Sequence, residues 1–251
     1  MKRTTLILMA LALTVLSPQS AVASIIYQND FETNTNGFSG FTTTVTLPIT
    51  AMPTPTSTFL GQFGNISGVP TSPSVLTLTG LAPGTPYTLA FDLFAGLRLD
   101  GTGTVEGNGP DPFTVFVGST STFLLNANFA NFHIQQQSYS DATPLGGGPF
   151  PKQTGADVTG VNDNGGNISS IYYFSHGAGN PLLTFTPTGS TETIMFTGSP
   201  NEDTVDEFYA IDNVVVTGAA VPEPSSFALV IIGIFAAARF FGWRRRKTAA
   251  A

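Results

Sequence analysis

Residues 209–217 read YAIDNVVVT, a short and largely apolar run of the length that forms one β-strand. Similar short runs, separated by segments rich in Gly, Pro and Asn, recur at residues 25–32, 75–81, 87–94, 113–118, 122–129, 168–174, 182–186 and 193–197. Almost no stretch between residues 24 and 218 has helical spacing. This pattern predicts an all-β fold, an antiparallel β-sandwich, over residues 24–218.

The segments between these runs predict loops and turns. Residues 96–111 and 140–166 are rich in Gly, Asn, Asp and Pro, so we expect two long loops there. A tight turn is expected between the runs 75–81 and 87–94, because Pro83 suits its first corner and Gly84 the positive φ that follows. The 21 Phe residues of the chain supply enough large apolar side chains for the core of one domain.

The charge of the chain is unevenly distributed. Between residues 24 and 220 there are fifteen Asp and Glu residues but only two basic residues, Arg98 and Lys152, which gives a formal charge of −13. Such a domain repels nucleic acid and attracts divalent cations, so no nucleic-acid partner is expected. Simple solubility is the alternative meaning of this charge. The absence of Cys excludes disulfides, thiolate metal ligands and a cysteine nucleophile.

The N-terminal segment has the pattern of a signal peptide. Lys2 and Arg3 precede an apolar stretch at residues 6–13, and the segment closes on Ala21-Val22-Ala23, the small-x-small pattern that signal peptidase accepts. We therefore expect a signal peptide at residues 1–23 and a mature protein that starts at Ser24. The alternative is an uncleaved membrane anchor, for which the apolar stretch is short.

The C-terminal segment predicts a single membrane span. Residues 219–226 form a linker that contains Pro222-Glu223-Pro224, and an apolar run interrupted by Arg239 follows at residues 227–243. As a helix, this run would cross about 26 Å of hydrocarbon. The tail at residues 244–251 carries a basic cluster, Arg244, Arg245, Arg246 and Lys247. The positive-inside rule keeps that cluster in the cytoplasm and places residues 24–218 on the far side of the membrane.

These three parts, in this order, resemble the PEP-CTERM sorting signal. The resemblance implies that the chain is a substrate of an exosortase, a processing enzyme in the inner membrane of Gram-negative bacteria that make exopolysaccharide. The chain would be held in the inner membrane by residues 227–243, cut near Pro222, and passed to the cell surface or the extracellular matrix. Both prolines keep the motif extended and unable to join the helix. A plain anchor with a proline-rich spacer is the alternative.

A second resemblance concerns the domain between the two ends. Residues 27–32, 182–186 and 209–216 together resemble jelly-roll, galactose-binding-like domains of the kind found in carbohydrate-binding modules. In those domains an early acidic residue and a late Ile-Asp-Asn share a structural calcium ion, and the matching residues here are Asp30, Glu32 and Asp212. Carboxylates and nearby carbonyl oxygens of two adjoining strands can supply the six to eight oxygens that calcium takes. The alternative is that these acids are solvated residues at strand ends.

The motifs of common hydrolases are missing. The sequence contains no Gly-x-Ser-x-Gly elbow and no His-Glu-x-x-His pattern, and its two histidines, His133 and His176, are isolated. Residues 162–167 superficially suggest a calcium loop but lack the Gly and Glu that an EF-hand needs. The acidic residues Glu202, Asp203, Asp206 and Glu207 could hold a cation, although a solvated loop is the commoner outcome.

The sequence as a whole therefore favours an exported surface or matrix protein that works by binding or structurally, without catalysis. A carbohydrate-binding domain, with exopolysaccharide as ligand, would present stacking aromatics such as Tyr139, Tyr172 or Tyr173. A purely structural or adhesive matrix protein would show neither a groove nor sugar affinity. A glycan-degrading enzyme is the third alternative, and it would need two carboxylates facing each other across a cleft.

Overall fold

The computed structural model describes residues 23–48, 56–103, 108–132, 135–162, 168–175 and 182–218. The signal peptide up to Val22, the Pro-Glu-Pro motif, the expected span at 227–243 and the basic cluster all lie outside these residues. None of the described residues belongs to a helix that could span a membrane. The folded unit runs from Ser24 to Ala219.

Strands are the regular elements of the described residues. In chain order they are β1 (Ser24–Asn29), β2 (Phe38–Gly40), β3 (Thr44–Pro48), β4 (Thr56–Phe63), β5 (Asn65–Ile66), β6 (Val69–Pro70), β7 (Ser74–Thr79), β8 (Tyr87–Leu97), β9 (Pro112–Val117), β10 (Thr122–Asn128), β11 (Gln136–Gln137), β12 (Phe150–Pro151), β13 (Val158–Asn162), β14 (Ile168–Phe174), β15 (Leu183–Phe185), β16 (Thr191–Gly198) and β17 (Glu207–Gly218).

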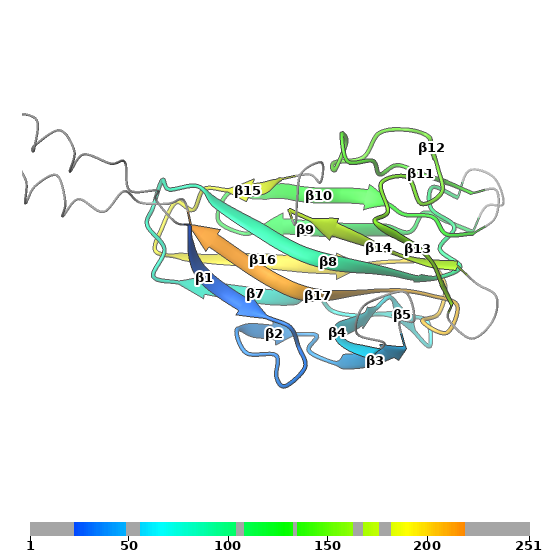
Figure 1. The fold of residues 1–251 in the computed structure, drawn as a ribbon, viewed down its shortest axis with the longest axis horizontal. Coiled ribbons are helices and arrows are strands. Elements are labelled where there is room, and N and C mark those ends of the chain that lie inside the picture. The colour runs from blue at the N-terminus through cyan, green and yellow to red at the C-terminus, as the bar shows by residue number, and fades with distance from the viewer. Residues whose placement is uncertain are drawn as a thin grey trace, which may run out of the picture. The chain divides into compact units, whose positions relative to one another are not determined.

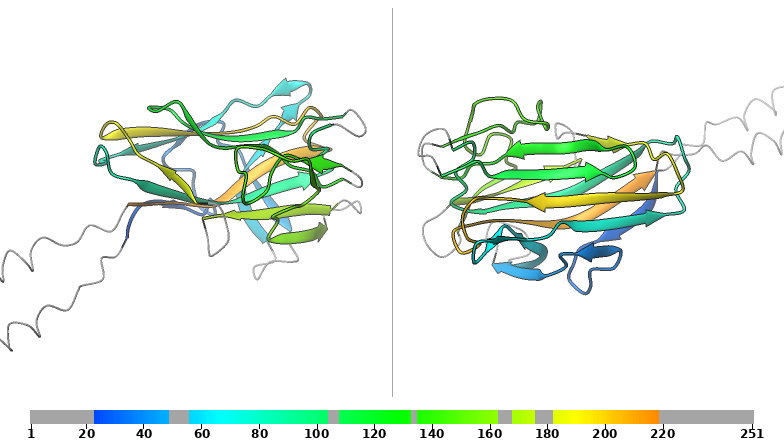
Figure 2. Two further views of the ribbon diagram at one scale, coloured as in Figure 1. Left: turned by 90° about the horizontal axis from the view of Figure 1, so that it is seen from above. Right: turned by 180° about the vertical axis from the view of Figure 1, so that it is seen from behind.

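Two large antiparallel sheets form the sandwich, and the pairs β5-β6 and β11-β12 form two further two-stranded sheets. The larger has eight strands with the order β13-β14-β8-β17-β4-β3, to which β1 adds on β17 and β15 on β8, and the smaller has five in the order β10-β9-β16-β7-β2. The sheets lie face to face: β8 and β17 are in front in Figure 1, and β16, β9 and β10 are in front when the molecule is seen from behind in Figure 2. The all-β antiparallel fold is thus confirmed, while jelly-roll-like connectivity stays a prediction.

The core fills the space between the two sheets. Strand β9 alternates buried and half-buried residues, as expected for a strand with one face on the core. The rings of Phe91, Phe113, Phe174 and Phe196 meet there, and Phe91 lies 4.8 Å from Phe174 and 5.4 Å from Phe196 between ring centroids. Packed aromatic rings therefore account for much of the apolar area that holds the sheets together.

Strand β8 is buried on both of its faces from Phe91 to Gly96. Its outer face is covered by a second apolar cluster, in which Phe94 lies 5.6 Å from the rings of Phe59 and Phe208. Because side chains alternate along a strand, Asp92 shares this outer face with Phe94. An acidic residue is thereby buried in the middle of the larger sheet, where it is 5% exposed.

A β-bulge interrupts the pairing of β17 with β8. The register passes from Asp212 opposite Asp92 to Val215 opposite Ala90, so β17 carries one extra residue. Asn213 takes a positive φ of 50° at this point, and its side-chain amide donates a hydrogen bond to Asp92 Oδ2 at 2.7 Å. The bulge thus places Asp212 and Asp92 together on the outer face.

All nine strands expected from the sequence are present, with ends shifted by a few residues. The expected turn is also present: Gly84 has φ +75° and Thr85 N donates to Ala82 O at 3.2 Å. The loop predicted at 140–166 is wrong in part, because it contains β12 and β13. The loop predicted at 96–111 begins only after β8 ends at Leu97.

Short or glycine-interrupted strands were missed. Strand β4 contains Gly61, where a Cβ would lie 2.6 Å from the Cβ of Ala210 on β17, so only glycine allows these strands to approach. Strand β13 contains Gly160 at φ +74°, beside a register shift. Glycine inside a strand breaks the apolar alternation on which the prediction rests.

Truncation of one aromatic ring tests this description of the core. Phe91→Ala should lower the free energy of unfolding by about 3–5 kcal/mol, because it leaves a cavity among the three rings that surround it. The melting temperature should fall by roughly 10 °C. Phe123→Ala is the matched control, since Phe123 is 44% exposed and lies outside the core. Thermal unfolding of the purified protein followed by circular dichroism measures both, and equal losses would contradict this account of the core.

Candidate functional site

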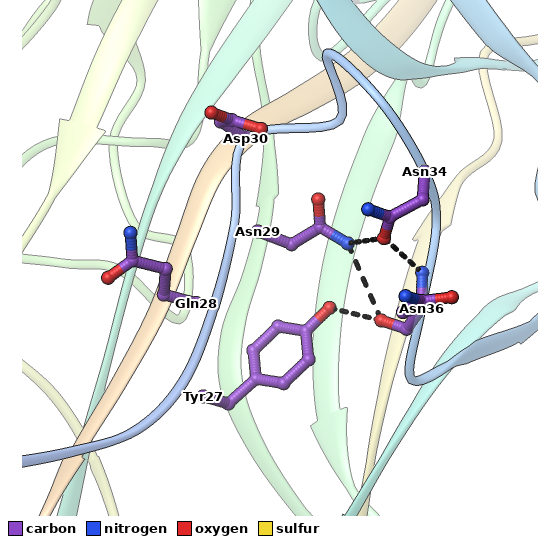
Figure 3. A pocket seen from close by; sticks show the side chains of 6 residues that line it. All are labelled: Tyr27, Gln28, Asn29, Asp30, Asn34 and Asn36. Carbon is purple, nitrogen blue, oxygen red and sulfur yellow. Dashed lines mark hydrogen bonds between the residues drawn. The ribbon is translucent and has the colours of Figure 1, made fainter.

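The described residues form a polar pocket of about 270 Å³ beside the first strand (Figure 3). Its lining comes from β1 and from the loop that joins β1 to β2, and consists of Tyr27, Gln28, Asn29, Asp30, Asn34 and Asn36. Four of the six are amides and one is a carboxylate. The pocket therefore suits a ligand that offers hydroxyl groups more than an apolar one.

Hydrogen bonds fold the loop back over β1. Tyr27 Oη donates to the carbonyl oxygen of Asn36 at 2.6 Å, and Asn29 Nδ2 donates to Asn34 Oδ1 and to Asn36 O at 3.4 Å. Asn29 Oδ1 accepts from the N–H of Phe31 at 2.8 Å. Figure 3 shows Tyr27 and Asn29 pointing toward the loop, while Gln28 points away from it. This side of the pocket is therefore built by internal hydrogen bonds.

The outer rim of the pocket is exposed. Gln28, Asp30 and Asn36 are exposed to solvent, whereas Asn29 is 9% exposed. Asp30 Oδ1 accepts one long hydrogen bond, at 3.3 Å, from the N–H of Glu32. Together with Asn34, which is also exposed, these side chains can contact a ligand.

The structure separates the three acids expected to share a calcium ion into a pair and a single residue. Glu32 and Asp212 lie on either side of Ser57, whose hydroxyl is 3.1 Å from Glu32 Oε1 and 2.7 Å from Asp212 Oδ2. The N–H of Thr58 also donates to Glu32 Oε1 at 2.8 Å. Asp30 instead lines the pocket described above. Ser57 could not be predicted as a partner of these acids, because a single serine in a sequence does not indicate a site.

Protein donors already satisfy part of this acidic pair. Asp212 is 1% exposed, and its Oδ1 accepts from the N–H of Asn213 at 2.7 Å. The pKa of Asp212 is raised to about 7, mainly by burial and to a smaller extent by the negative charges of Asp92 and Glu32, while its hydrogen bonds with Ser57 and Asn213 act in the opposite direction. Glu32 is exposed, and the N–H of Thr58 lowers its pKa. A calcium ion here would have to replace the Ser57 hydroxyl bridge, and calcium shared by Asp30, Glu32 and Asp212 stays a prediction.

The aromatic residues expected to stack on sugars are mostly core residues. Tyr139 and Tyr172 are each 1% exposed, and Tyr139 stacks on Phe129 with ring centroids 4.7 Å apart. Tyr172 Oη donates to Gln137 Oε1 at 3.3 Å. Tyr173 is half-buried against the outer cluster around Phe94. Tyr139 and Tyr172 therefore do not present the stacking surfaces that a carbohydrate-binding domain would offer, because their rings belong to the core of the sandwich.

The acidic run before β17 is divided by the fold. Asp203 accepts hydrogen bonds from the N–H groups of Ser67 at 2.9 Å and Val205 at 3.3 Å, so it shapes the loop. Glu207 turns inward and is 0% exposed. It meets Asp100 and Asp111, which the sequence placed only in a long loop. The feature of the sequence that could have pointed to Asp100 and Asp111 is their position on either side of the glycine-rich stretch 101–110.

Other residues considered from the sequence are not placed. His133, His176 and residues 163–167 lie outside the described residues, so the structure does not bear on them.

Comparison with known proteins identifies the C-terminal segment. Residues 220–247 match the PEP-CTERM protein-sorting motif, which marks the chain as an exported protein that exosortase processing delivers to the cell surface. No curated protein matches the chain. The solved structures that match include the K3 cleaved adhesin domain of Lys-gingipain (Kgp) from Porphyromonas gingivalis W83, at 12% identity and a TM-score of 0.38, over 77% of this chain and 99% of that one. No residue role is carried over from that domain.

Removal of the Ser57 hydroxyl group tests whether its hydrogen bond to Asp212 stabilises the fold. Ser57→Ala should leave the buried Asp212 Oδ2 without its donor, which costs about 1–3 kcal/mol. The melting temperature at pH 8 should fall by roughly 5 °C. Ser39→Ala is the control, because Ser39 is exposed and its bond to Val75 O is 3.4 Å long. Calorimetry of both variants decides the matter: a Ser57→Ala protein that melts with the wild type would show that the bridge contributes nothing.

Proposed function

We propose that this protein is a non-catalytic component of the cell surface or extracellular matrix, released from its membrane anchor by an exosortase and associated there with exopolysaccharide. The observation that carries the proposal is the sorting motif at residues 220–247. Signal peptidase would first remove residues 1–23 during export across the inner membrane of a Gram-negative cell. The β-sandwich would be the part that remains in place.

The fold supports processing at both ends of the domain. Ser24 and Gly218 are cross-strand partners in the pairing of β1 with β17. Cuts before Ser24 and near Pro222 would therefore leave every described strand pair intact. A domain with no cysteine also needs no oxidative step to reach its final fold after export.

The amide-lined pocket supports sugar binding as the mode of action. Carboxylate and amide groups at the exposed rim, on Gln28, Asp30 and Asn36, can donate to and accept from neighbouring hydroxyl groups of a polysaccharide. The burial of Tyr139 and Tyr172 removes two stacking partners and favours the second candidate, a structural or adhesive matrix protein without sugar affinity.

Glycan degradation is the least supported alternative. Asp100 and Glu207, which lie close to the partly exposed Glu202, are 4% and 0% exposed. Asp212, which shares Ser57 with the exposed Glu32, is 1% exposed. A glycosidase places its two carboxyl groups on opposite sides of an open substrate cleft. Buried carboxyl groups of this kind do not reach a sugar ring.

Removal of the sorting motif tests the first part of the proposal. Replacing Pro222, Glu223 and Pro224 together by Ala should leave full-length protein in the inner membrane, since the processing enzyme would not recognise the segment. Cell fractionation and intact-mass measurement detect the change. Release of the altered protein into the surface fraction at the wild-type level would reduce the motif to a spacer.

Sugar binding is tested separately. Purified protein should bind exopolysaccharide in a pull-down or on a glycan array, and Asp30→Asn combined with Gln28→Ala should weaken that binding by about tenfold or more, because two rim contacts are lost. Asp141→Asn removes an exposed carboxylate outside the pocket and is the matched control. Wild-type protein without sugar affinity would favour the structural alternative.

A further inference from the structure

A buried group of carboxyl residues lies where β8 ends and where β9 and β17 begin (Figure 1). We call it the carboxyl cluster, and it consists of Asp100, Asp111, Glu202 and Glu207. Asp100 follows β8, Asp111 directly precedes β9, Glu202 lies in the loop between β16 and β17, and Glu207 is the first residue of β17. Four separate segments therefore bring their negative charges to one place.

Three members of this cluster have the spacing of metal ligands. Asp100, Glu202 and Glu207 each place one carboxylate oxygen within 4.8 Å of those of the other two. Oxygens bound to one calcium ion lie about 2.3–2.6 Å from it, so two of them are at most about 5 Å apart. The observed spacing matches that limit.

Backbone donors orient the cluster. The N–H groups of Asp100 and Gly101 donate to Asp111 Oδ2 at 2.6 and 2.8 Å, and the N–H of Asn201 donates to Asp111 Oδ1 at 3.3 Å. The N–H of Asp100 also lies 3.1 Å from Glu207 Oε1. Asp111 is thus satisfied by the backbone and acts as a support for the residues around it.

Glu207 supplies the observation that points to a ligand. Its side chain is 0% exposed, and among the residues that the structure describes no N–H or O–H group donates to its second oxygen, Oε2. The charges that act on Glu207 are those of Asp111, Asp100 and Glu202, all of them negative. A buried carboxylate oxygen without a described donor, set among negative charges, is a place where a cation would be bound favourably.

Glu207 and Asp111 both have raised pKa values in this structure, which holds no metal ion. Burial, followed by the neighbouring Asp111, raises the pKa of Glu207 to about 10, and burial raises the pKa of Asp111 to about 6. The negative charges that raise the pKa of Glu207 would also attract a divalent cation to this place.

We propose that Asp100, Glu202 and Glu207 bind one calcium ion, which joins the end of β8 to the loop before β17 and to the start of β17. The ligands are all hard oxygen donors, as calcium prefers. Magnesium needs shorter bonds, of about 2.0–2.1 Å, in strict octahedral geometry and usually keeps several waters, so a site with three protein carboxylates suits calcium better. Glu202 is only partly buried, so the ion would enter the site from solvent on the side of Glu202. The site is independent of the sugar-binding pocket.

Calcium binding is tested on the full chain purified in nonionic detergent and freed of metal by chelation. Equilibrium dialysis should find one calcium ion per chain. Calcium at about a hundredfold excess over its Kd should raise the melting temperature by roughly 5–10 °C above the chelator sample. Magnesium at matched ionic strength should give a much smaller rise, which separates specific binding from screening of the acidic domain. Equal melting temperatures in all three conditions would overturn the proposal.

The variants assign the ion to this cluster. Glu207→Gln should abolish the calcium response but keep the metal-free melting temperature, because the amide has nearly the same shape as the carboxyl group and can donate to Asp111. Glu202→Gln, at the partly exposed ligand, should weaken binding by about tenfold or more even if Glu207→Gln does not fold. Asp141→Asn, which removes an exposed carboxylate elsewhere, should respond like the wild type. A response kept in Glu207→Gln or Glu202→Gln but lost in Glu32→Gln would place calcium beside Asp212 and overturn the proposal.

Discussion

The pairing of β8 with β17 is the constraint on which the rest of the structure depends. These are the two longest strands described, and they pair along their whole length apart from the bulge at Asn213. Glu207 lies opposite Leu97 at one end of the pair, and Gly218 lies opposite Tyr87 at the other. One pairing therefore sets the carboxyl cluster at one end, the buried acids in the middle, and the exit of the chain toward its sorting motif at the far end.

Burial of acids in a domain with only two basic residues is the second constraint. Each buried carboxyl group must find donors, a proton or a cation, because no nearby positive charge is available to most of them. Glu192, 2% exposed, meets this need with the N–H groups of Ser119 and Thr193 at 2.9 Å. Asp212 meets it with Ser57 and with the N–H of Asn213. Glu207 meets it only in part, which sets the carboxyl cluster apart from the other buried acids.

Sequence patterns predicted the strands better than the sites. The nine longer runs were found because one-sided burial leaves an apolar pattern that can be read locally. The strands that were missed are β2, β3, β5, β6, β11 and β12, which have two to five residues, and β4 and β13, which contain Gly61 and Gly160. The acidic pair of Glu32 and Asp212 was anticipated, yet the serine between them was not. Whether Tyr139 and Tyr172 stack on a ligand could not be read from the sequence, because an aromatic residue looks the same there whether it packs in a core or lies at the surface.

The sequence by itself determined the fold class, the acidic character of the domain and the sorting motif at residues 220–247, because each is written in neighbouring residues or in composition. Only the tertiary structure decided which acids meet. Asp100 and Glu207 are 107 residues apart in the chain, yet the N–H of one lies 3.1 Å from the carboxylate of the other. Contacts of this kind follow from strand register over the whole sheet, and no local pattern of residues encodes them.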